Sequence, residues 1–505
     1  MTRTAFGQCV VQIFTALVVG ACTTVFVTAA VAADAPSQPN IVLIVADDMG
    51  WNDVGFHGSE INTPHLDAIA EQGVELDRFY VQPTCSPTRS SLMTGKSSVR
   101  FGITVPIDKN SRRGIPLEET LLPEELARVG YQSLMTGKWH LGHAEKRYFP
   151  HHRGFEHFYG HVTGGIGYWD HTHGGGYDWQ RNGTTVREEG YTTHLIVDEA
   201  TALLARRDKA RPTFLYVAFN APHLPNEAPQ SAIDVYRETE NRNRRVHSAM
   251  VSELDAGIGR LLEALDREGM SDNTLIWFTS DNGGLNRATS PSPLVAFSEK
   301  LVSWFGEPLP IEALEFLRAN MLDGGADNTP LRGGKTSVYE GGVRVPAAIW
   351  WPGHIEGGKS DTFITAQDVL PTLLEAAGHA DIIANDLDGT TRLAALKSGE
   401  TVLEHPDYFV AGLDGEALYR GDLKLVVASG GPFGEPVAEL YNVRVDPMEL
   451  EDIASEHPSD VREMRETIDA WPRGASIRSS VITILLDPDR FGGEEDREPW
   501  ADVAK

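Results

Sequence analysis

The sequence predicts an α/β protein: a large domain with a mostly parallel mixed sheet flanked by helices, followed by a smaller C-terminal α+β domain with an antiparallel sheet. The first observation is that two apolar runs, 41–46 and 275–278, are each followed by acidic residues. The second is that strand-like and helix-like segments alternate between and after these runs, which indicates a mostly parallel sheet. The third is the length of 505 residues, which is enough for one large domain and a smaller one.

The elements of the large domain can be read in chain order. The runs 41–46 and 275–278 are continuously apolar, which is typical of parallel strands covered on both faces. Apolar spacing then predicts two helices and two further strands. The expected helices are 63–74 and 117–130, and the expected strands are 131–137 and 212–223.

Polar ligand atoms stand directly after both apolar strands. Asp47 and Asp48 follow the first strand, and Asp281 and Asn282 follow the second. In a mostly parallel sheet, ligands bind at the carboxyl ends of the strands. Three carboxylates and an amide oxygen form an all-oxygen ligand set, which suits Ca²⁺, with Mg²⁺ as the alternative.

Cysteine use is sparse and draws attention to one residue. The three cysteines are Cys9, Cys22 and Cys85, and the first two fall inside an apolar N-terminal segment. Cys85 is open to three interpretations: a buried small side chain, a thiolate nucleophile, or a derivative that carries oxygen. A thiolate is a poor partner for a hard cation, and an oxygen-bearing group at position 85 removes that conflict.

The overall charge narrows the classes of partner. The chain carries 44 basic and 72 acidic residues, a formal net charge of −28. A surface this acidic repels nucleic acid and anionic membranes at long range, so no nucleic-acid partner is expected. If the substrate is an anion, its attraction must come from a local pocket of fixed positive charge.

The N-terminal segment 1–33 is expected to be a signal peptide. Arg3 supplies the positive charge, an apolar stretch follows, and small residues lead to a cleavage site near Ala32 or Ala33. An exported protein, periplasmic or secreted, follows from this interpretation. Two alternatives stay open: an uncleaved N-terminal anchor, because the apolar stretch is long, and a lipoprotein modified at Cys22.

The stretch CSPTRSSLMTG, which begins at Cys85, resembles the signature of type I sulfatases, the formylglycine-dependent family within the alkaline phosphatase superfamily. Further motifs that resemble the family follow one another in its order, and together they are far more specific than any one alone. They are ADDMGW, TGKWHLG, APHLP, SDNGG, PLRGGKTSVYEGGVRVP and a C-terminal ELYNVRVDPMELEDIA. YWDHTH and PLRGGK place the resemblance nearest to the arylsulfatase B-like branch.

The resemblance implies the alkaline-phosphatase-like sulfatase fold and the hydrolysis of sulfuric esters. Cys85 would be oxidised to formylglycine by a formylglycine-generating or anaerobic sulfatase-maturating enzyme. The hydrated aldehyde would then serve as nucleophile and as a metal ligand. The implied metal ligands are Asp47, Asp48, Cys85 in its modified form, Asp281 and Asn282.

The same resemblance assigns the remaining catalytic roles. Arg89 would fix the formylglycine side chain, and Lys138 and Lys335 would clamp the sulfate. His140 would act as base at the aldehyde hydrate, and His223 would protonate the leaving alcohol.

A glycine-rich loop at 160–179 is the expected sugar contact. Its glycines allow close approach of the backbone, and its side chains offer ring faces and hydrogen-bonding groups. By resemblance to the branch, the expected substrate is a sulfated sugar or polysaccharide fragment. The candidate substrate residues are Tyr168, Trp169, Asp170, His171 and His173, together with Lys138, His223 and Lys335.

An alternative function is a phosphodiesterase or phosphonate monoester hydrolase of the same superfamily. GKWHLG together with RGGK favours sulfate over phosphate.

The expected domain organisation is a sulfatase catalytic domain at 34–395 and a smaller domain at 404–505. Within the first, residues 285–328 are expected to form an inserted helical hairpin, which is either a surface packing element or a lid or oligomer contact. The last stretch, 489–505, is acidic and is expected to be a loose tail.

Overall fold

The computed structural model describes residues 38–109, 111–173, 176–286, 324–429, 435–475 and 498–505. The expected signal peptide at 1–33 lies outside these residues. Most of the expected helical insertion, residues 287–323, also lies outside them. The described residues all belong to the unit that begins at Gln38.

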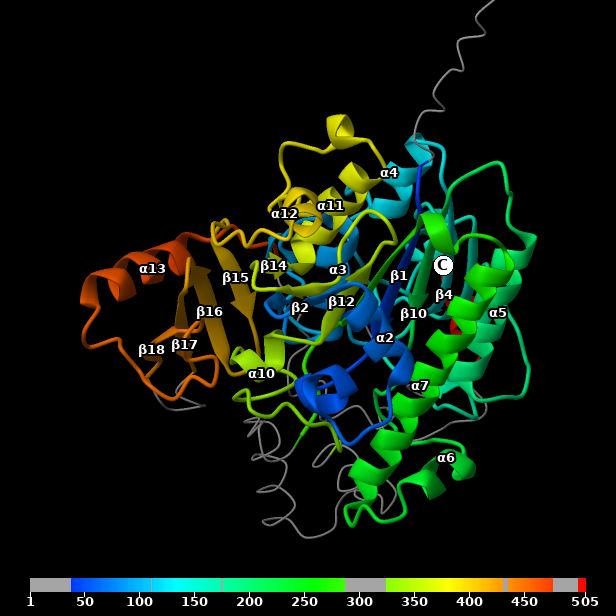
Figure 1. Ribbon diagram of the computed structural model, residues 1–505, viewed down its shortest axis with the longest axis horizontal. Helices are drawn as coiled ribbons and strands as arrows, with labels where there is room; N and C mark the ends of the chain where they lie inside the picture. The colour runs from blue at the N-terminus through cyan, green and yellow to red at the C-terminus, as the bar shows by residue number, and fades with distance from the viewer. Residues whose placement is uncertain (1–37, 110, 174–175, 287–323, 430–434, 476–497) are drawn as a thin grey trace, which may run out of the picture. The chain divides into compact units, whose positions relative to one another are not determined.

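A ten-stranded mixed sheet forms the centre of the molecule (Figure 1). Its five middle strands, from β11 to β5 in spatial order, run parallel to one another. Antiparallel strands extend the sheet on both sides. In spatial order the strands are β13 (Gly358–Ser360), β2 (Val74–Leu76), β12 (Ala347–Trp350), β11 (Thr274–Ser280), β1 (Asn40–Ala46), β10 (Thr213–Ala218), β4 (Gln132–Lys138), β5 (His157–His161), β8 (Gln180–Arg181) and β9 (Thr184–Thr185).

The apolar run of β1 is buried on both faces because its side chains alternate between two cores. Ile41, Leu43 and Val45 point into one hydrophobic cluster, and Val42 and Ile44 point into the other. This explains why the strand is continuously apolar rather than alternating.

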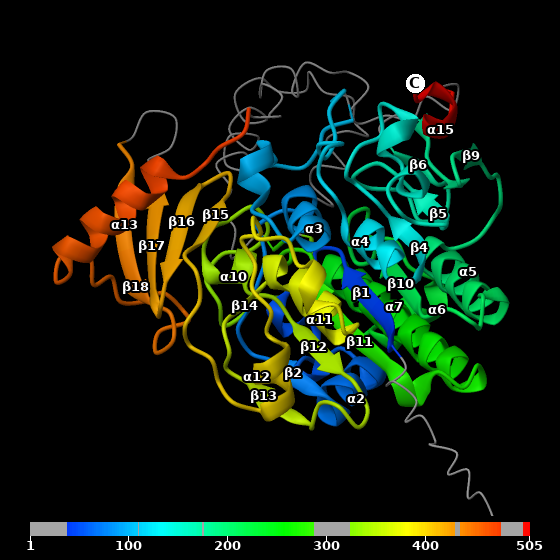
Figure 2. The same cartoon turned by 90° about the horizontal axis from the view of Figure 1, so that it is seen from above.

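Helices cover both faces of the sheet (Figures 1 and 2). None of the helices that the structure describes has the length and apolar composition to span a lipid bilayer. One face carries α2 (Pro64–Gln72), α5 (Thr192–Arg206), α6 (Gln230–Val235) and α7 (Arg242–Arg267); the other carries α3 (Cys85–Thr94), α4 (Leu122–Arg128), α11 (Val369–Ala376) and α12 (Leu393–Ser398).

The fold class predicted from the sequence is confirmed. The strands expected at 131–137 and 212–223 are β4 and β10, although β10 ends earlier than predicted, at Ala218, and the helix expected at 63–74 is α2. The helix expected at 117–130 is shorter than predicted, since α4 begins only at Leu122.

A four-stranded antiparallel sheet forms the C-terminal part, as predicted. One of its faces packs against α13, and the other packs towards the short helix α10 (Glu340–Val343). In order, its elements are β15 (Tyr408–Ala411), β16 (Gly415–Arg420), β17 (Leu423–Ala428), β18 (Val437–Asn442) and α13 (Pro458–Ala470).

A buried group of charges joins this sheet to α10, and we call it the Lys424 cluster. Lys424 Nζ lies 3.1 Å from Glu340 Oε1 and 2.7 Å from Glu449 Oε1. The hydroxyls of Tyr80 and Tyr419 donate to Glu340 at 2.9 and 2.7 Å. Since α10 starts five residues after Lys335, this cluster holds a segment that leads into the site described next.

The end of the chain differs from the sequence expectation. The stretch 489–505 is expected to be a loose tail, yet residues 498–505 are packed against the large domain and include helix α15 (Trp500–Val503). Ala501 and Ala504 are buried in the main hydrophobic core. The acidic composition of the stretch does not reveal these small apolar contacts.

Candidate active site

Five neighbouring parallel strands end at one edge of the central sheet, and polar side chains stand at each of these ends. β1 is followed by Asp47 and β11 by Asp281. Lys138 is the last residue of β4, and His161 is the last residue of β5. The loop after β10 carries His223. Such an edge is the usual ligand-binding place of a parallel sheet.

The two acidic loops are in direct contact. Asp48 adopts a left-handed backbone conformation with φ of +68°, which is uncommon outside glycine and turns the chain sharply after β1. Its backbone N–H donates to Asp281 Oδ1 at 3.3 Å. Asn282 Nδ2 donates to Asp48 Oδ1 at 2.7 Å. The four predicted oxygen-bearing residues therefore lie around one point.

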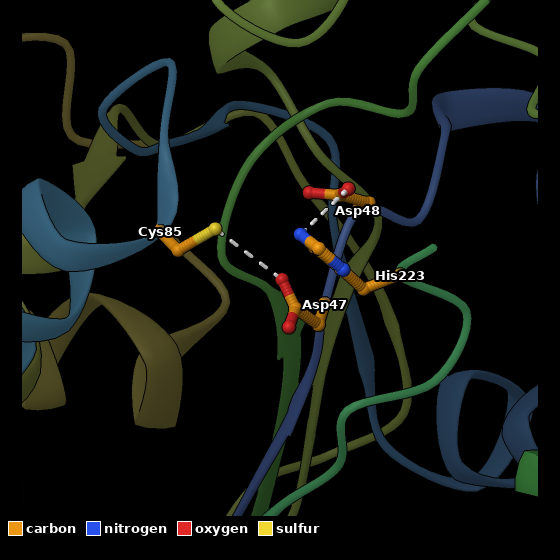
Figure 3. Close-up of side chains that lie close together, drawn as sticks. All are labelled: Asp47, Asp48, Cys85 and His223. Atoms are coloured by element: carbon orange, nitrogen blue, oxygen red, sulfur yellow. Dashed lines mark hydrogen bonds and ion pairs between the residues drawn. The ribbon is translucent and has the colours of Figure 1, made fainter. Parts of the chain in front are cut away.

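Cys85 is the first residue of helix α3, and its side chain is directed towards Asp47 (Figure 3). Its Sγ lies 3.4 Å from Asp47 Oδ1, and the residue is buried. Arg89 follows one helical turn later and therefore lies on the same face. The Nε and Nη2 of Arg89 lie 2.8 and 2.7 Å from Asp281 Oδ2.

Two lysines complete the charge arrangement. Lys138 is fully buried and pairs with Asp47, and Lys335 Nζ donates to Asp48 Oδ2 at 2.6 Å. We call Asp47, Asp48, Asp281, Arg89, Lys138 and Lys335 the site cluster. Its three carboxylates and three cations balance, so a bound divalent cation makes this pocket net positive within a strongly acidic protein.

The electrostatics of Cys85 disfavour a free thiolate. Burial and the carboxylate of Asp47 raise the pKa of the Cys85 thiol well above its usual range. Burial and Asp47 also raise the pKa of Asp281 to about 6. Burial acts against ionisation of Asp48, but the ammonium of Lys335 and the ring of His223 outweigh it and hold the pKa of Asp48 below its usual range. An unmodified Cys85 is therefore a neutral thiol, which is a weak nucleophile.

The residues present fit a cation. Asp47, Asp48, Cys85 and His223 each offer one ligand atom, and these four atoms lie within 4.8 Å of one another. The buried Asn282 Oδ1 has no hydrogen-bond partner among the described residues. A buried acceptor without a donor is costly, and a cation satisfies it. This four-atom group includes His223 and does not include Asp281, whose Oδ2 pairs with Arg89.

Two histidines expose opposite ring nitrogens. His140 Nε2–H donates to Ile107 O at 3.1 Å, so its neutral ring leaves Nδ1 as a lone pair, which has no partner among the described residues. His223 Nδ1–H donates to Leu224 O at 2.7 Å, so its Nε2 faces Asp48 Oδ2 at 3.7 Å. Burial, reinforced by Lys138, lowers the pKa of His140 far below its usual value, which keeps this ring neutral.

Comparisons with known proteins agree with this geometry. A family model described as Sulfatase matches residues 39–379, which is more than half of the chain. The chain belongs to the sulfatase family. It is therefore a sulfuric ester hydrolase by class, as the sequence motifs predicted.

Two of the similar proteins are themselves named as sulfatases. The chain is 35% identical to arylsulfatase J of Mus musculus over 68% of its length, and the match spans 53% of that relative. It is 32% identical to N-acetylgalactosamine-6-sulfatase of Homo sapiens over 79% of its length, and here the match spans 72% of the relative. A crystal structure of Ps i-CgsB in complex with k-i-k-neocarrahexaose is similar at 29% identity with a TM-score of 0.75, covering 90% of this chain and 98% of that one.

The sulfatase site is bordered by a loop that we call the rim loop, residues 161–173 and 176–178. Its glycines are required by close approach: a Cβ on Gly164 would lie 2.5 Å from His140 Nε2. A Cβ on Gly165 would lie 3.3 Å from both His173 and His223. The rim loop therefore lies directly over the two histidines of the site.

Two of the predicted sugar residues are turned into the protein. Tyr168 is fully buried, and its hydroxyl lies 2.9 and 2.8 Å from the carbonyl oxygens of Asn220 and His223. His171 is also buried, stacks on Trp179, and bonds to Gly190 O through Nε2 at 2.9 Å. Neither ring is open to a ligand in this structure, and Tyr168 instead supports the backbone that carries His223.

The other three predicted sugar residues lie at the surface of the rim. Trp169 is 50% exposed and leans on Tyr191. Asp170 is exposed, with Oδ1 accepting from Thr172 N at 2.9 Å. His173 is half-buried, and its Nδ1 bonds to Thr163 Oγ1 at 2.9 Å.

Two further residues near the site, His161 and Asp178, lie outside the residues predicted from the sequence motifs. His161 is fully buried beside Lys138 in the register of β4 and β5, and neither ring nitrogen has a hydrogen-bond partner among the described residues. Asp178 is buried and accepts from Val162 N, Thr163 N and Thr163 Oγ1, which fixes the start of the rim loop. A signal for His161 was present, because it ends a strand-like run in the same way that Lys138 does.

Proposed function

We propose that this sulfatase removes sulfate from a sulfated sugar and that it uses Cys85 in the formylglycine form together with a divalent cation. The observation that carries the proposal is the place of Cys85. It is a buried neutral thiol beside Asp47 in an otherwise oxygen-rich cluster. A thiol is a poor nucleophile and a poor hard-metal ligand there, whereas an aldehyde hydrate suits both roles.

The divalent cation and the formylglycine would each have a specific chemical role. A bound Ca²⁺ or Mg²⁺ would offset negative charge on a sulfate oxygen and on the nucleophile. Formylglycine at position 85 would supply the attacking oxygen. The residues that would hold the cation are Asp47, Asp48, Asp281, Asn282 and residue 85, with His223 close to the group.

The chain's own cations bind and orient the substrate. Lys138 and Lys335 lie on two different carboxylates of the site cluster, so a sulfate placed there meets an ammonium group on either side. Arg89 spans from Asp281 to the carbonyl of Lys138 at 3.0 Å and fixes the positions of both. A sulfate ester spreads its charge over three oxygens, so such positioning and charge neutralisation are the main tasks.

The two histidines move protons. Hydrolysis converts an ester and water into an alcohol and sulfate, and the oxygen released from sulfur must gain a proton. His223 presents Nε2 towards the site cluster, and we assign this donation to it. His140 presents the Nδ1 lone pair, and we assign to it the removal of a proton from the group at position 85. Such transfers contribute roughly 10²- to 10⁴-fold each.

The rim loop is the proposed sugar contact. Trp169 offers an exposed ring, and Asp170 and His173 offer polar groups near the site. The named activity of N-acetylgalactosamine-6-sulfatase and the carrageenan oligosaccharide bound to Ps i-CgsB support a sugar as the leaving group. We also propose that the protein is exported and is matured by a formylglycine-forming enzyme.

A substrate panel tests the proposal. Protein co-expressed with a maturation enzyme should be assayed with nitrophenyl sulfate, N-acetylgalactosamine-6-sulfate, carrageenan oligosaccharides and bis(nitrophenyl) phosphate. We expect sulfate release from a sugar and much slower cleavage of the phosphodiester. Faster cleavage of the phosphodiester would favour the phosphodiesterase alternative. No turnover of any sulfate by protein that carries the aldehyde would reject the proposal.

A further inference from the structure

Helix α15, far from the site in sequence, contacts the rim loop through Trp500 (Figure 2). The indole Nε1–H of Trp500 donates to the carbonyl oxygen of His173 at 2.9 Å. The same indole ring meets the ring of His143 edge to face, with centroids 5.2 Å apart. His143 follows the predicted GKWHLG motif directly, so Trp500 touches two segments that border the sulfate pocket.

The segment around Trp500 is firmly held. Ala501 and Ala504 are only 2% and 7% exposed and belong to the main hydrophobic core. Lys505 N donates to Ala144 O at 3.1 Å, and Lys146 N donates to Lys505 O at 2.8 Å. Burial of the two alanines and the two main-chain hydrogen bonds of Lys505 therefore fix the position of the indole.

His173 is held from two sides. Its ring bonds through Nδ1 to Thr163 Oγ1, and the Thr163 hydroxyl donates to Asp178 Oδ2 at 2.5 Å. Its backbone carbonyl is held by Trp500. Nε2 is left as the ring nitrogen without a hydrogen-bond partner among the described residues. His173 lies near enough to His223 and Lys138 for their charges to lower its pKa, after burial, to about 3.

The hairpin that carries His173 needs outside support. Its strands β6 (Thr172–His173) and β7 (Gly176–Tyr177) contain two residues each. An isolated two-stranded hairpin is marginally stable at best. The half-buried indole of Trp500 donates its N–H to the carbonyl of His173 and so holds this hairpin from outside.

We infer that Trp500 is a positioning residue for sugar recognition: its indole N–H sets the place of His173, so residues 498–505 contribute to the sugar-binding rim. This inference rests on the proposed function, because it assigns the sugar to the rim loop. It assigns no part in sulfate chemistry to Trp500, which touches no residue of the site cluster among its described contacts.

The test is Trp500→Phe, which keeps an aromatic ring against His143 and removes the N–H donor. For the sulfated sugar that the panel above selects, we expect KM to rise by about 3- to 10-fold, the worth of one hydrogen bond. Nitrophenyl sulfate has no sugar to contact the rim loop, so its kcat and KM should stay within about twofold of the wild-type values. Trp471→Phe is the matched control, since the Trp471 N–H has no partner among the described residues.

A second variant approaches the same contact from the hairpin. A Cβ on Gly176 would lie 2.9 Å from Trp500 Nε1, so Gly176→Ala should displace the indole and raise the sugar KM in the same direction. Gly358→Ala is its control, because a Cβ there meets nothing within 4 Å.

Amide hydrogen exchange separates this inference from the proposed function, since it needs no turnover. Trp500→Phe should speed exchange at the amides of residues 176–178 and leave the central strands protected. Unchanged exchange in the hairpin would overturn the inference even if the wild type hydrolyses sugar sulfates. Equal losses on both substrates with a lowered melting temperature would also overturn it, because the segment would then only stabilise the fold. A wild type that hydrolyses no sugar sulfate would remove the proposed function and this inference with it.

Discussion

The site cluster and the Lys424 cluster are both groups of buried charges, yet they differ in what they leave unpaired. In the Lys424 cluster each oxygen of Glu340 and Glu449 has a partner within the protein. The partners are tyrosine hydroxyls, a backbone N–H and, for Glu449 Oε1, an ion pair with the lysine ammonium at 2.7 Å in place of a hydrogen bond. In the site cluster the cations also pair with carboxylates, but Asn282 Oδ1 and His140 Nδ1 beside it have no partner among the described residues.

The difference separates a structural cluster from a reactive one. Buried ionic groups with all partners present hold parts of a fold in register. Buried polar atoms without partners are costly, and where they lie beside a cluster of charges a ligand can satisfy them. The position in the sheet adds to the argument, because only the site cluster lies at the carboxyl ends of parallel strands.

The largest expected effect is loss of the group at position 85. Cys85→Ala should lower turnover of nitrophenyl sulfate by about 10⁴-fold or more, as removal of a covalent nucleophile does. Peptide mass spectrometry of active wild type should find residue 85 as the lighter aldehyde, and a hydrazide probe should label it.

The control for this variant lies on the same helix. Ser91→Ala removes a buried hydroxyl with no partner among the described residues, and activity should stay near wild type. Full activity of protein whose Cys85 is an intact thiol would contradict the formylglycine proposal and reopen the thiol interpretation.

The next effect concerns the cation. Asp281→Asn should weaken Ca²⁺ or Mg²⁺ binding in calorimetry and lower turnover by about 10³-fold, because one charged ligand and the partner of Arg89 are lost together. Chelation of the wild type should abolish turnover, and Ca²⁺ or Mg²⁺ should restore it better than Zn²⁺.

Asp255→Asn is the matched control for Asp281→Asn. Burial raises the pKa of Asp255 to about 6, as it does for Asp281, but Asp255 accepts from the backbone of His65 and Leu66 at the start of α2. It should cost stability and leave metal binding unchanged. Restoration by Zn²⁺ alone would instead favour a softer site that includes the nitrogen of His223 and the Cys85 sulfur.

The site cluster and the Lys424 cluster also differ in how well they could be predicted from the sequence. The site cluster comes from short motifs at strand ends, where local sequence fixes both the strand and the residue after it. The candidate metal and catalytic residues from Asp47 to Lys335 could therefore be proposed from the sequence alone, and the structure brings them together. The Lys424 cluster pairs Glu340 with Lys424, which lies 84 positions later in the chain, and no local sequence pattern predicts such a pair.

In the rim loop, too, the contacts of individual side chains could not be predicted from local sequence. The sequence pointed to a loop that borders the site, but it did not predict the direction of each side chain. Tyr168 and His171 turn inward because Asn220 and Gly190 offer acceptors there. Trp500 was missed because it lies in an acidic stretch and reaches His173 across 327 positions.

The third prediction is a leaving-group dependence. His223→Ala should lower turnover of a sugar sulfate by about 10²- to 10⁴-fold, because a sugar alkoxide needs its proton. On nitrophenyl sulfate the loss should be much smaller, since the phenolate leaves unprotonated. Parallel kcat measurements on both substrates provide the check. Equal losses would mean that His223 only binds sulfate or the cation.

The fourth prediction concerns stability rather than catalysis. Lys424→Met leaves two buried carboxylates without their cation and should lower the free energy of unfolding by about 3–5 kcal/mol. Below the unfolding transition its kcat on nitrophenyl sulfate should stay within about threefold of wild type. Lys138→Met is the counterpart in the site cluster and should abolish turnover. A Lys424 variant that folds normally but loses activity would show that the two clusters act as one.

The smallest expected effect is a pH dependence within the Lys424 cluster. Burial raises the pKa of Glu449 to about 7, and Glu340 adds to the shift because one lysine faces two carboxylates. The folded state therefore holds this proton at pH values where the unfolded state has released it, between roughly pH 4.5 and 7. Stability then falls as pH rises through this window. Glu449→Gln lacks the titrating group, so its free energy of unfolding relative to wild type, measured by urea denaturation, should increase from pH 5 to pH 8 by about 2–3 kcal/mol. Glu451→Gln, an exposed glutamate in the same loop, should show no such trend. If the two variants gave the same pH profile, the proton would not reside on Glu449, and the cluster would be fully ionised across this range.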